Sequence, residues 1–218
     1  MSFQIFQINE TYSILYDSKL DGVDLRKLIL NDELKIDINI PEKPAGQSLN
    51  VIFNPSLITA KIKNGLININ NINYGNSYNG VIQFIFRNSN TQEALQDNFN
   101  EFLRYTMVLQ GIKNVLHYEM HLSGLINRKY NKFDNSNIES IKTINHPQNF
   151  GFKIFNEGTD KNLLNGQIRI INVEPYVADT GKTQIDFLYR VSEQLTKSFF
   201  SKTMEDLRYI INNYTGDK

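Results

Sequence analysis

The residues with the clearest chemical potential in this sequence form the segment His117-Tyr118-Glu119-Met120-His121. If this segment is a β-strand, residues two apart share a face, so His117, Glu119 and His121 point the same way. A histidine suits acid–base chemistry near neutral pH, and two ligands at positions i and i+2 of a strand can share one metal ion. These three residues are the candidates for a catalytic site, and His117 and His121 are the candidates for a metal site.

The spacing of the segment limits what it can bind. On an ideal strand His117 and His121 lie roughly 13 Å apart, at about 3.3 Å per residue. One ion would therefore need a bulge or outside ligands, and His146, which precedes Pro147, is one residue that could complete a three-ligand set. The alternative is that these side chains are only the polar face of a half-buried strand. The inner face of that strand would carry Leu116, Tyr118, Met120 and Leu122.

Two short motifs resemble catalytic signatures but lack the rest of the pattern. Gly181-Lys182-Thr183 matches the end of a phosphate-binding loop, yet Tyr176 stands where the first glycine belongs and a strand follows instead of a helix. Asp179-Thr180-Gly181 matches the aspartic-protease triplet, but that chemistry needs a second carboxylate to share a proton, and no second copy exists. A hairpin turn explains both motifs.

A mixture of basic and aromatic residues near the middle of the chain could hold phosphate and stack bases. It consists of Arg128, Lys129, Tyr130, Lys132 and Phe133. The wider composition does not support nucleic acid as a partner, because Lys plus Arg and Asp plus Glu are both 23 and the formal net charge is zero. We read these five residues as a solvated polar loop.

Composition also bounds the compartment and the partners. The 218 residues include no cysteine, which excludes disulfides and thiolate chemistry and fits a cytoplasmic protein. We expect no signal peptide and no membrane span, because no apolar run is long enough. No motif indicates a cofactor, so we expect none. We expect a protein or peptide partner, and self-association into a homo-oligomer is an open alternative.

Apolar periodicity predicts two long amphipathic helices, each following a strand. The first is expected at about 91–110, with Asn90 and Glu93 as a capping box and Gly111 at its end. The second is expected at about 192–213, with Ser192 as its N-cap. Their buried stripes are predicted to be Leu95, Phe99, Phe102, Leu103 and Met107, and Leu195, Phe199, Met204, Leu207, Ile211 and Tyr214.

Alternation of apolar and polar residues predicts strands in the rest of the chain. A short helix is expected at 21–31, and Asn64-Gly65 suits a tight hairpin because both turn positions favour positive φ. The strands are expected at 3–8, 11–16, 34–40, 57–63, 66–72, 80–86, 115–122, 150–155, 167–173 and 183–191. The fold class is α+β, with mostly antiparallel sheet. We predict a single domain, 1–218, of two similar β-then-α halves, 1–111 and 112–218, with no repeat visible at the level of residues.

The C-terminal segment resembles a large, sporadically distributed family of uncharacterised bacterial proteins. The resemblance is carried by Phe187-Leu188, Ser192-Glu193, Leu195, Phe199 and the run from Thr203 to Arg208. It extends to Gln83–Arg87, to Phe99 and Phe102, and to Leu125–Arg128, about half of the chain. His117 and His121 lie outside the family's pattern. The resemblance implies a bacterial, intracellular, two-half α+β protein, and the family's sporadic distribution suggests a defence- or toxin-related role.

Two functions from different classes follow. The first is a non-catalytic binding protein of a bacterial cytosolic system, which needs an exposed apolar patch or an open sheet edge. The second is a metal-assisted or acid–base enzyme that uses His117, Glu119 and His121, which needs a concave pocket around those side chains.

Overall fold

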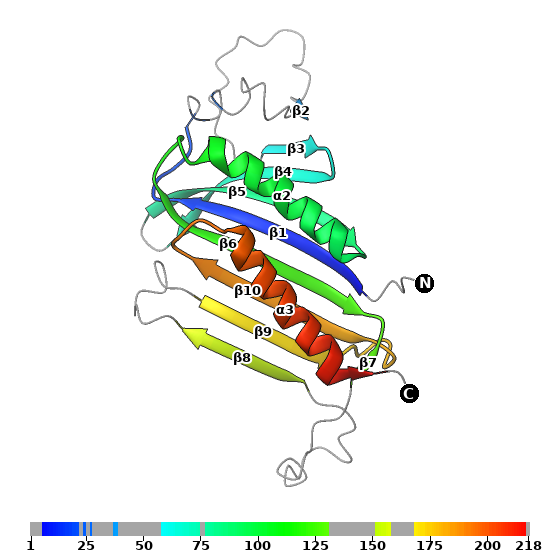
Figure 1. Ribbon diagram of the computed structural model, residues 1–218. Coiled ribbons are helices and arrows are strands. Elements are labelled where there is room, and N and C mark those ends of the chain that lie inside the picture. The colour runs from blue at the N-terminus through cyan, green and yellow to red at the C-terminus, as the bar shows by residue number, and fades with distance from the viewer. Residues whose placement is uncertain are drawn as a thin grey trace.

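The computed structural model describes residues 6–21, 24, 27, 37–38, 58–74, 77–130, 151–157 and 168–216. Within these ranges the chain forms a nine-stranded antiparallel sheet, a two-stranded pairing and two 18-residue helices (Figure 1). The strands are β1 Phe6–Tyr16, β2 Asp37–Ile38, β3 Ile58–Ile62, β4 Gly65–Tyr74, β5 Ser77–Ser89, β6 Val115–Ile126, β7 Lys129–Tyr130, β8 Phe152–Glu157, β9 Ile168–Pro175, β10 Thr183–Val191 and β11 Thr215–Gly216; the helices are α2 Gln92–Leu109 and α3 Lys197–Tyr214. The predicted α+β class is confirmed.

The order of strands in the large sheet shows how the two halves meet. It reads β2-β3-β4-β5-β1-β6-β10-β9-β8, so β1 and β6 lie side by side at the centre. Outward from the centre, β5, β4 and β3 on one side correspond to β10, β9 and β8 on the other. In each series the strand nearest the centre, β5 or β10, comes last in the chain and leads into a long helix. The predicted layout of two similar β-then-α halves is therefore confirmed.

The pairing registers relate the two halves by an approximate twofold axis. Thr11 of β1 pairs with His121 of β6, and their outer neighbours are Ile85 and Leu188 respectively. A half-turn about the Thr11–His121 pair therefore exchanges β5 with β10 and, one strand further out, β4 with β9. The axis passes between Thr11 and one of the predicted site residues, His121.

This symmetry reveals a repeat that our reading of the sequence missed. The strand segment Phe84-Ile85-Phe86-Arg87 coincides in position with Phe187-Leu188-Tyr189-Arg190, and Leu66-Ile67-Asn68-Ile69 coincides with Ile170-Ile171-Asn172-Val173. The expectation of no residue-level repeat is wrong. The likeness is confined to short strands, and connections of different length separate them, so it is visible only once the registers align the two halves.

Both helices lie against the same face of the large sheet (Figure 1). They run antiparallel to each other, because Arg208 near the end of α3 donates to Gln92 at the start of α2, and Gln194 before α3 donates to Thr106 near the end of α2. Between them the rings of Phe99 and Phe200 stack with centroids 4.4 Å apart.

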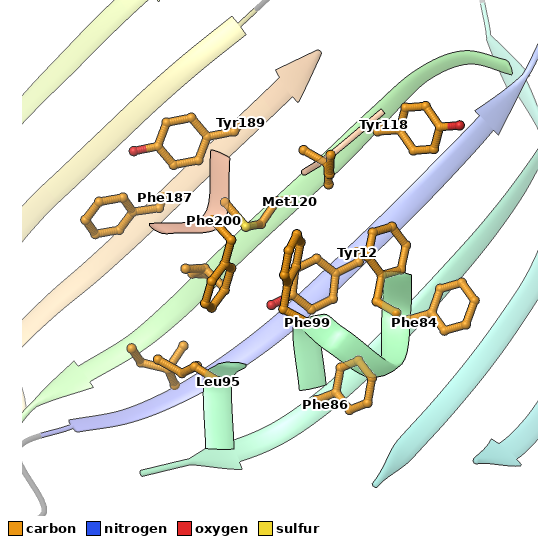
Figure 2. Packing of buried hydrophobic residues seen from close by; sticks show 14 of the residues in the cluster. Tyr12, Phe84, Phe86, Leu95, Phe99, Tyr118, Met120, Phe187, Tyr189 and Phe200 are labelled. Carbon is orange, nitrogen blue, oxygen red and sulfur yellow. The ribbon is translucent and has the colours of Figure 1, made fainter. Parts of the chain in front are cut away.

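The core lies between this helix pair and the sheet (Figure 2). Its centre is aromatic: the ring of Tyr12 on β1 stacks on Phe102 of α2 at 4.9 Å between centroids, and Phe84 of β5 stacks on Tyr105 at 5.2 Å. Aromatic pairs at these distances add to the stabilisation that their buried area provides. The prediction that two apolar helix stripes pack on a sheet is confirmed.

Details of the helices differ from the sequence-based expectation. Met107 is 72% exposed, and Tyr105 and Leu109 take the inward positions instead, because the helix face that meets the sheet is rotated toward them. The N-caps are Thr91 and Thr196, whose hydroxyls accept from the amides of Ala94 and Phe199, rather than Asn90 and Ser192. The second helix begins five residues later than expected, at Lys197 rather than about Ser192.

The other local predictions have mixed outcomes. Residues 6–16 form one continuous strand where two short ones were expected. The β3–β4 hairpin is confirmed, but its turn residues are Lys63 and Asn64, neither of which has a positive φ. Of the predicted helix 21–31 the structure describes Asp21, Asp24 and Lys27, and the last two are helical. Of the predicted strand 34–40 it describes 37–38, which form β2. The other residues of both predictions lie outside the described residues.

Gly124 shows how closely the two central strands approach. It pairs with Ile8 on β1, and a Cβ atom added there would overlap the carbonyl oxygen of Gln7. The obstacle is backbone in the middle of the sheet, which cannot move aside without breaking the β1–β6 ladder. Glycine is therefore required at this position for steric reasons.

Candidate binding face

The face of the large sheet opposite α2 and α3 is the candidate functional surface, and we call it the open face. Residues of β1 alternate between the two sides: Ile8, Tyr12 and Ile14 are fully buried beneath the helices, whereas Thr11 and Ser13 point to the open face. Neither of the two described helices lies on that face (Figure 1).

The structure places His117, Glu119 and His121 together on the open face, as their spacing predicts. Their partners across the ladder are Leu15, Ser13 and Thr11 of β1. The inward positions of the same strand are filled by Tyr118, Met120 and Leu122, which are all buried, while Leu116 is only half-buried next to a register irregularity.

The side chains of Glu119 and His121 each bond to a residue of the neighbouring strand β10, and they do not converge on a common ligand. Glu119 accepts from Arg190, with its Oε2 atom 3.0 Å from Nε and 2.8 Å from Nη2. His121 Nε2 lies 2.5 Å from Asp186 Oδ1, and both side chains are about two-fifths exposed. The His121–Asp186 contact is exposed, and exposed polar pairs contribute little to stability, so its main effect is to hold the two side chains in place. The Glu119–Arg190 pair is more buried, with Arg190 16% and Glu119 22% exposed.

No metal-binding set forms around these residues in the part of the chain that the structure describes. There, no three His, Asp or Glu side chains come close enough together to hold an ion. His146, the suggested third ligand, lies outside the described residues, so the three-ligand set that includes it is an untested prediction.

Two of the three predicted site residues do line a cavity. Its volume is about 120 Å³, and its wall consists of Ser13, Leu15, Ile72, Val81, Gln83, His117, Glu119 and Arg190. Four of these are nearly buried: Ser13 is 6% exposed, Leu15 4%, Val81 7% and His117 4%. One side of the cavity is thus aliphatic and the other polar. His121, two residues further along β6, is not among the lining residues.

The sequence signal for the other lining residues was the alternation within β1, β5 and β10. That alternation assigns Ser13, Gln83 and Arg190 to one face of their strands, but it cannot say which strands are neighbours. Only the registers bring Gln83 beside Ser13, Ser13 beside Glu119, and Glu119 beside Arg190.

A second, wider hollow of about 790 Å³ lies where β1 and α2 end and β6 begins. Its polar side chains bond to one another: Gln110 Nε2 donates to the Tyr118 hydroxyl at 3.1 Å, and Asn114 Nδ2 to Asp17 Oδ2 at 3.1 Å. Lys113 Nζ lies 3.0 Å from Asp24 Oδ2. These bonds tie the end of β1 to the α2–β6 connection, so we assign this hollow a structural role.

An ionisable group of a different kind lies under the helices. Glu10 has no exposed surface, and its carboxylate accepts hydrogen bonds from Tyr12, Ser89 and Asn98, at 2.5, 2.5 and 2.8 Å. Burial raises the pKa of Glu10 to about 7, and the three hydrogen bonds oppose that rise. Burial and the adjacent Glu10 raise the pKa of Tyr12 well above its ordinary value, so its hydroxyl keeps its proton and donates it.

The short motifs have structural explanations. Asp179 to Lys182 form the turn between β9 and β10. The Asp179 carboxylate pairs with Lys182 at 3.0 Å and also accepts from the amide of Gly181 at 3.0 Å, and both contacts lower its pKa. Thr183 then begins β10, so the turn interpretation is confirmed. In the basic and aromatic cluster, Lys129 and Tyr130 form β7, paired with β11, while Lys132 and Phe133 lie outside the described residues.

Comparison of the chain with family models, curated proteins and solved structures finds no match. The family resemblance of the C-terminal segment therefore stays a prediction. Neither helix of the described part is long and apolar enough to cross a membrane.

Proposed function

We propose that this chain is a non-catalytic binding protein of a bacterial cytosolic system, and that the open face is where a protein or peptide partner binds. The cytosolic and bacterial setting rests on the lack of cysteine and on the family resemblance. The observation that carries the binding proposal is that both described helices cover the same face of a broad sheet, which leaves the other face with half-buried apolar side chains.

The apolar side chains on the open face are arranged in a row across the strands. Leu66, Ile85, Leu188 and Ile170 lie on β4, β5, β10 and β9, with Thr11 and His121 between them on the two central strands. All four are partly exposed. Six neighbouring strands at about 4.8 Å span about 24 Å, which is wide enough for a partner's strand or helix. A mixture of apolar and polar groups is also typical of non-obligate interfaces.

The binding proposal predicts that a charge placed in this row weakens binding of the partner. In Leu188→Lys the new ammonium lies at the centre of the open face, whereas Met107→Lys places the same group on the outer, exposed side of α2. A partner is first captured from the organism that encodes the chain, then purified and titrated. We expect Leu188→Lys to raise Kd about tenfold or more, as for a central interface residue, and Met107→Lys to leave it unchanged.

Two results would contradict this proposal. One is an equal loss of affinity in both variants, and the other is full affinity in Leu188→Lys. Sedimentation of the isolated protein is measured alongside, because a self-association that only Leu188→Lys disrupts would identify a second copy of the chain as the occupant.

An acid–base enzyme is the second candidate, and the cavity that His117 and Glu119 line favours it. Its metal-assisted form predicts about one bound ion per chain, lost in His117→Ala and in His121→Ala. Because these histidines are separated along β6 and Glu119 is held by Arg190, we expect metal analysis to find far less than one ion in the wild type and no difference in the variants. One equivalent of metal that disappears in either variant would favour the enzyme instead.

A further inference from the structure

We infer that the cavity beside Glu119 is a binding site for a neutral, phenol-sized group with one polar end, and that in the complex it accepts a tyrosine side chain of the partner. The occupant rests on the proposed binding function of the open face. The site itself is argued from its size, its charge and its difference from the twofold-related place on the open face.

The size of the cavity matches a single aromatic ring. Its volume is about 120 Å³, and a cavity of about 150 Å³ lined by aliphatic and aromatic side chains is known to bind benzene. The same space would hold about four waters at about 30 Å³ each. Leu15, Ile72 and Val81 form an aliphatic wall against which water is poorly satisfied, so a ring is the better occupant of that side.

The charges of the cavity favour a neutral ligand with a polar tip. The one guanidinium, Arg190, is already compensated by Glu119 through two short hydrogen bonds. A carboxylate ligand would meet Glu119, and an ammonium ligand would meet Arg190. Ser13 and Gln83, whose side chains lie 3.5 Å apart across the ladder, provide hydroxyl and amide groups that can bond to a phenol hydroxyl.

The approximate twofold axis supplies an internal comparison. Rotation about it superimposes Ser13 on Ser123 and Leu15 on Leu125. It also brings the end of β10 at Arg190 to the end of β5 at Arg87. These three positions therefore carry the same residue type in both halves.

Four further lining positions can be compared through the registers, and all four differ. The cavity has Val81 and Gln83 on β5, where the twofold-related positions on β10 are Gln184 and Asp186. Where the C-terminal half has His117 and Glu119 on β6, the N-terminal half has Gln7 and Asn9 on β1, and both of these are exposed. The two twofold-related places thus share three residue types and differ at four positions, so a ligand that fits the cavity is not expected to fit the other place.

The test uses p-cresol, which is the tyrosine side chain without its backbone, and monitors the ring resonances of His117. The chain has three histidines, and a His121→Asn variant assists the assignment. We expect p-cresol to cause a saturable shift of the His117 resonances. Toluene, which lacks the hydroxyl, should bind about fivefold more weakly because the polar wall is left unpaired, and p-methylbenzoate should not bind.

Matched variants localise the binding to one of the two twofold-related places. Leu15→Phe fills the cavity and should abolish the p-cresol shift, whereas Leu125→Phe adds the same bulk at the twofold-related position and should leave it intact. If Leu15→Phe does not fold, Gln83→Leu takes its place: this residue is half-buried, and its loss should remove the preference for p-cresol over toluene.

Three results would overturn the inference: no saturable shift with p-cresol, equal binding of toluene, or an equal effect of Leu15→Phe and Leu125→Phe. Its failure is distinguishable from failure of the proposed function. If Leu188→Lys loses the partner but p-cresol does not bind, the binding face stands and the tyrosine site is wrong. If p-cresol binds but Leu188→Lys keeps the partner, the cavity stands as a site for a phenol, and the proposal that the partner binds to the open face is wrong.

Discussion

Replacing Phe99 with alanine is expected to lower the free energy of unfolding by about 3–5 kcal/mol, the usual cost of removing a fully buried ring. Phe99 has no exposed surface and contacts three other rings, those of Tyr12, Phe102 and Phe200. For a chain of this length the loss corresponds to a fall of roughly 6–20 °C in Tm. Urea unfolding followed by circular dichroism measures it.

The matched control is Met107→Ala on the same helix. Met107 is 72% exposed, so this change should alter the free energy of unfolding by less than about 0.5 kcal/mol. Equal effects of the two substitutions would show that α2 does not pack on the sheet in the orientation described.

A double-mutant cycle extends the test to the contact between the halves. Phe99 and Phe200 belong to different helices and their rings stack at 4.4 Å. Phe99→Ala and Phe200→Ala should therefore couple by about 0.5–1.5 kcal/mol, the range for aromatic pairs. Strict additivity would mean that the two helices stabilise their own halves independently.

The second large effect is a loss of stability as pH rises, caused by Glu10. Below pH 4.5 this residue is protonated in both the folded and unfolded states. Between 4.5 and about 7 the unfolded state loses the proton while the buried carboxyl of the folded state keeps it, so the folded state becomes relatively less stable. Each tenfold difference in proton affinity is worth about 1.4 kcal/mol, so the total loss is about 3 kcal/mol, complete above pH 7.

Glu10→Gln tests this because it keeps the shape of the side chain and cannot ionise. The difference in unfolding free energy between variant and wild type should move in favour of the variant by about 3 kcal/mol between pH 4.5 and pH 8. Directly, the carboxyl carbon of Glu10 should titrate near pH 7 by NMR. Ser89→Ala removes one hydrogen bond to the carboxylate and should raise that pKa further.

Glu93→Gln is the control for burial, because it removes an exposed carboxylate from the first turn of α2. It should leave the pH dependence of stability close to that of the wild type. A wild type whose stability is flat from pH 4.5 to 8, or a carboxyl carbon of Glu10 that titrates near 4.5, would contradict the buried position of this residue.

Local pattern was sufficient for the elements whose burial follows a simple period. The apolar stripe of α2 and the alternation of β10 each depend on contacts with a single neighbouring layer, so their periodicity is written in the sequence. Helix α2 was expected at about 91–110 and is observed at 92–109, and the strand at 183–191 has the predicted bounds. The shared face of His117, Glu119 and His121 follows from the same alternation.

Predictions were wrong or missing where the burial or hydrogen bonding of a side chain depends on residues distant in the chain. Met107 matches the helical period of the apolar stripe, yet the rotation of α2 on the sheet leaves it exposed. Glu10 interrupts an apolar alternation, and nothing nearby indicates that Ser89 and Asn98 will provide hydrogen bonds to it. For Glu10 these partners lie about 80 to 90 positions away in the chain, and for α2 the inward ring of Tyr105 is placed by Phe84 on another strand of the sheet.

The sequence by itself determined the α+β class, the two β-then-α halves and the polar face of β6, because each of these follows from residues that are neighbours along one element. The tertiary structure alone decided that β1 and β6 meet at the centre, that the halves are related through Thr11 and His121, and that Glu119 faces Arg190 across a cavity. The physical reason is that a strand's side-chain period states which residues share a face, whereas backbone hydrogen bonds between strands are the same for every residue and carry no record of the partner.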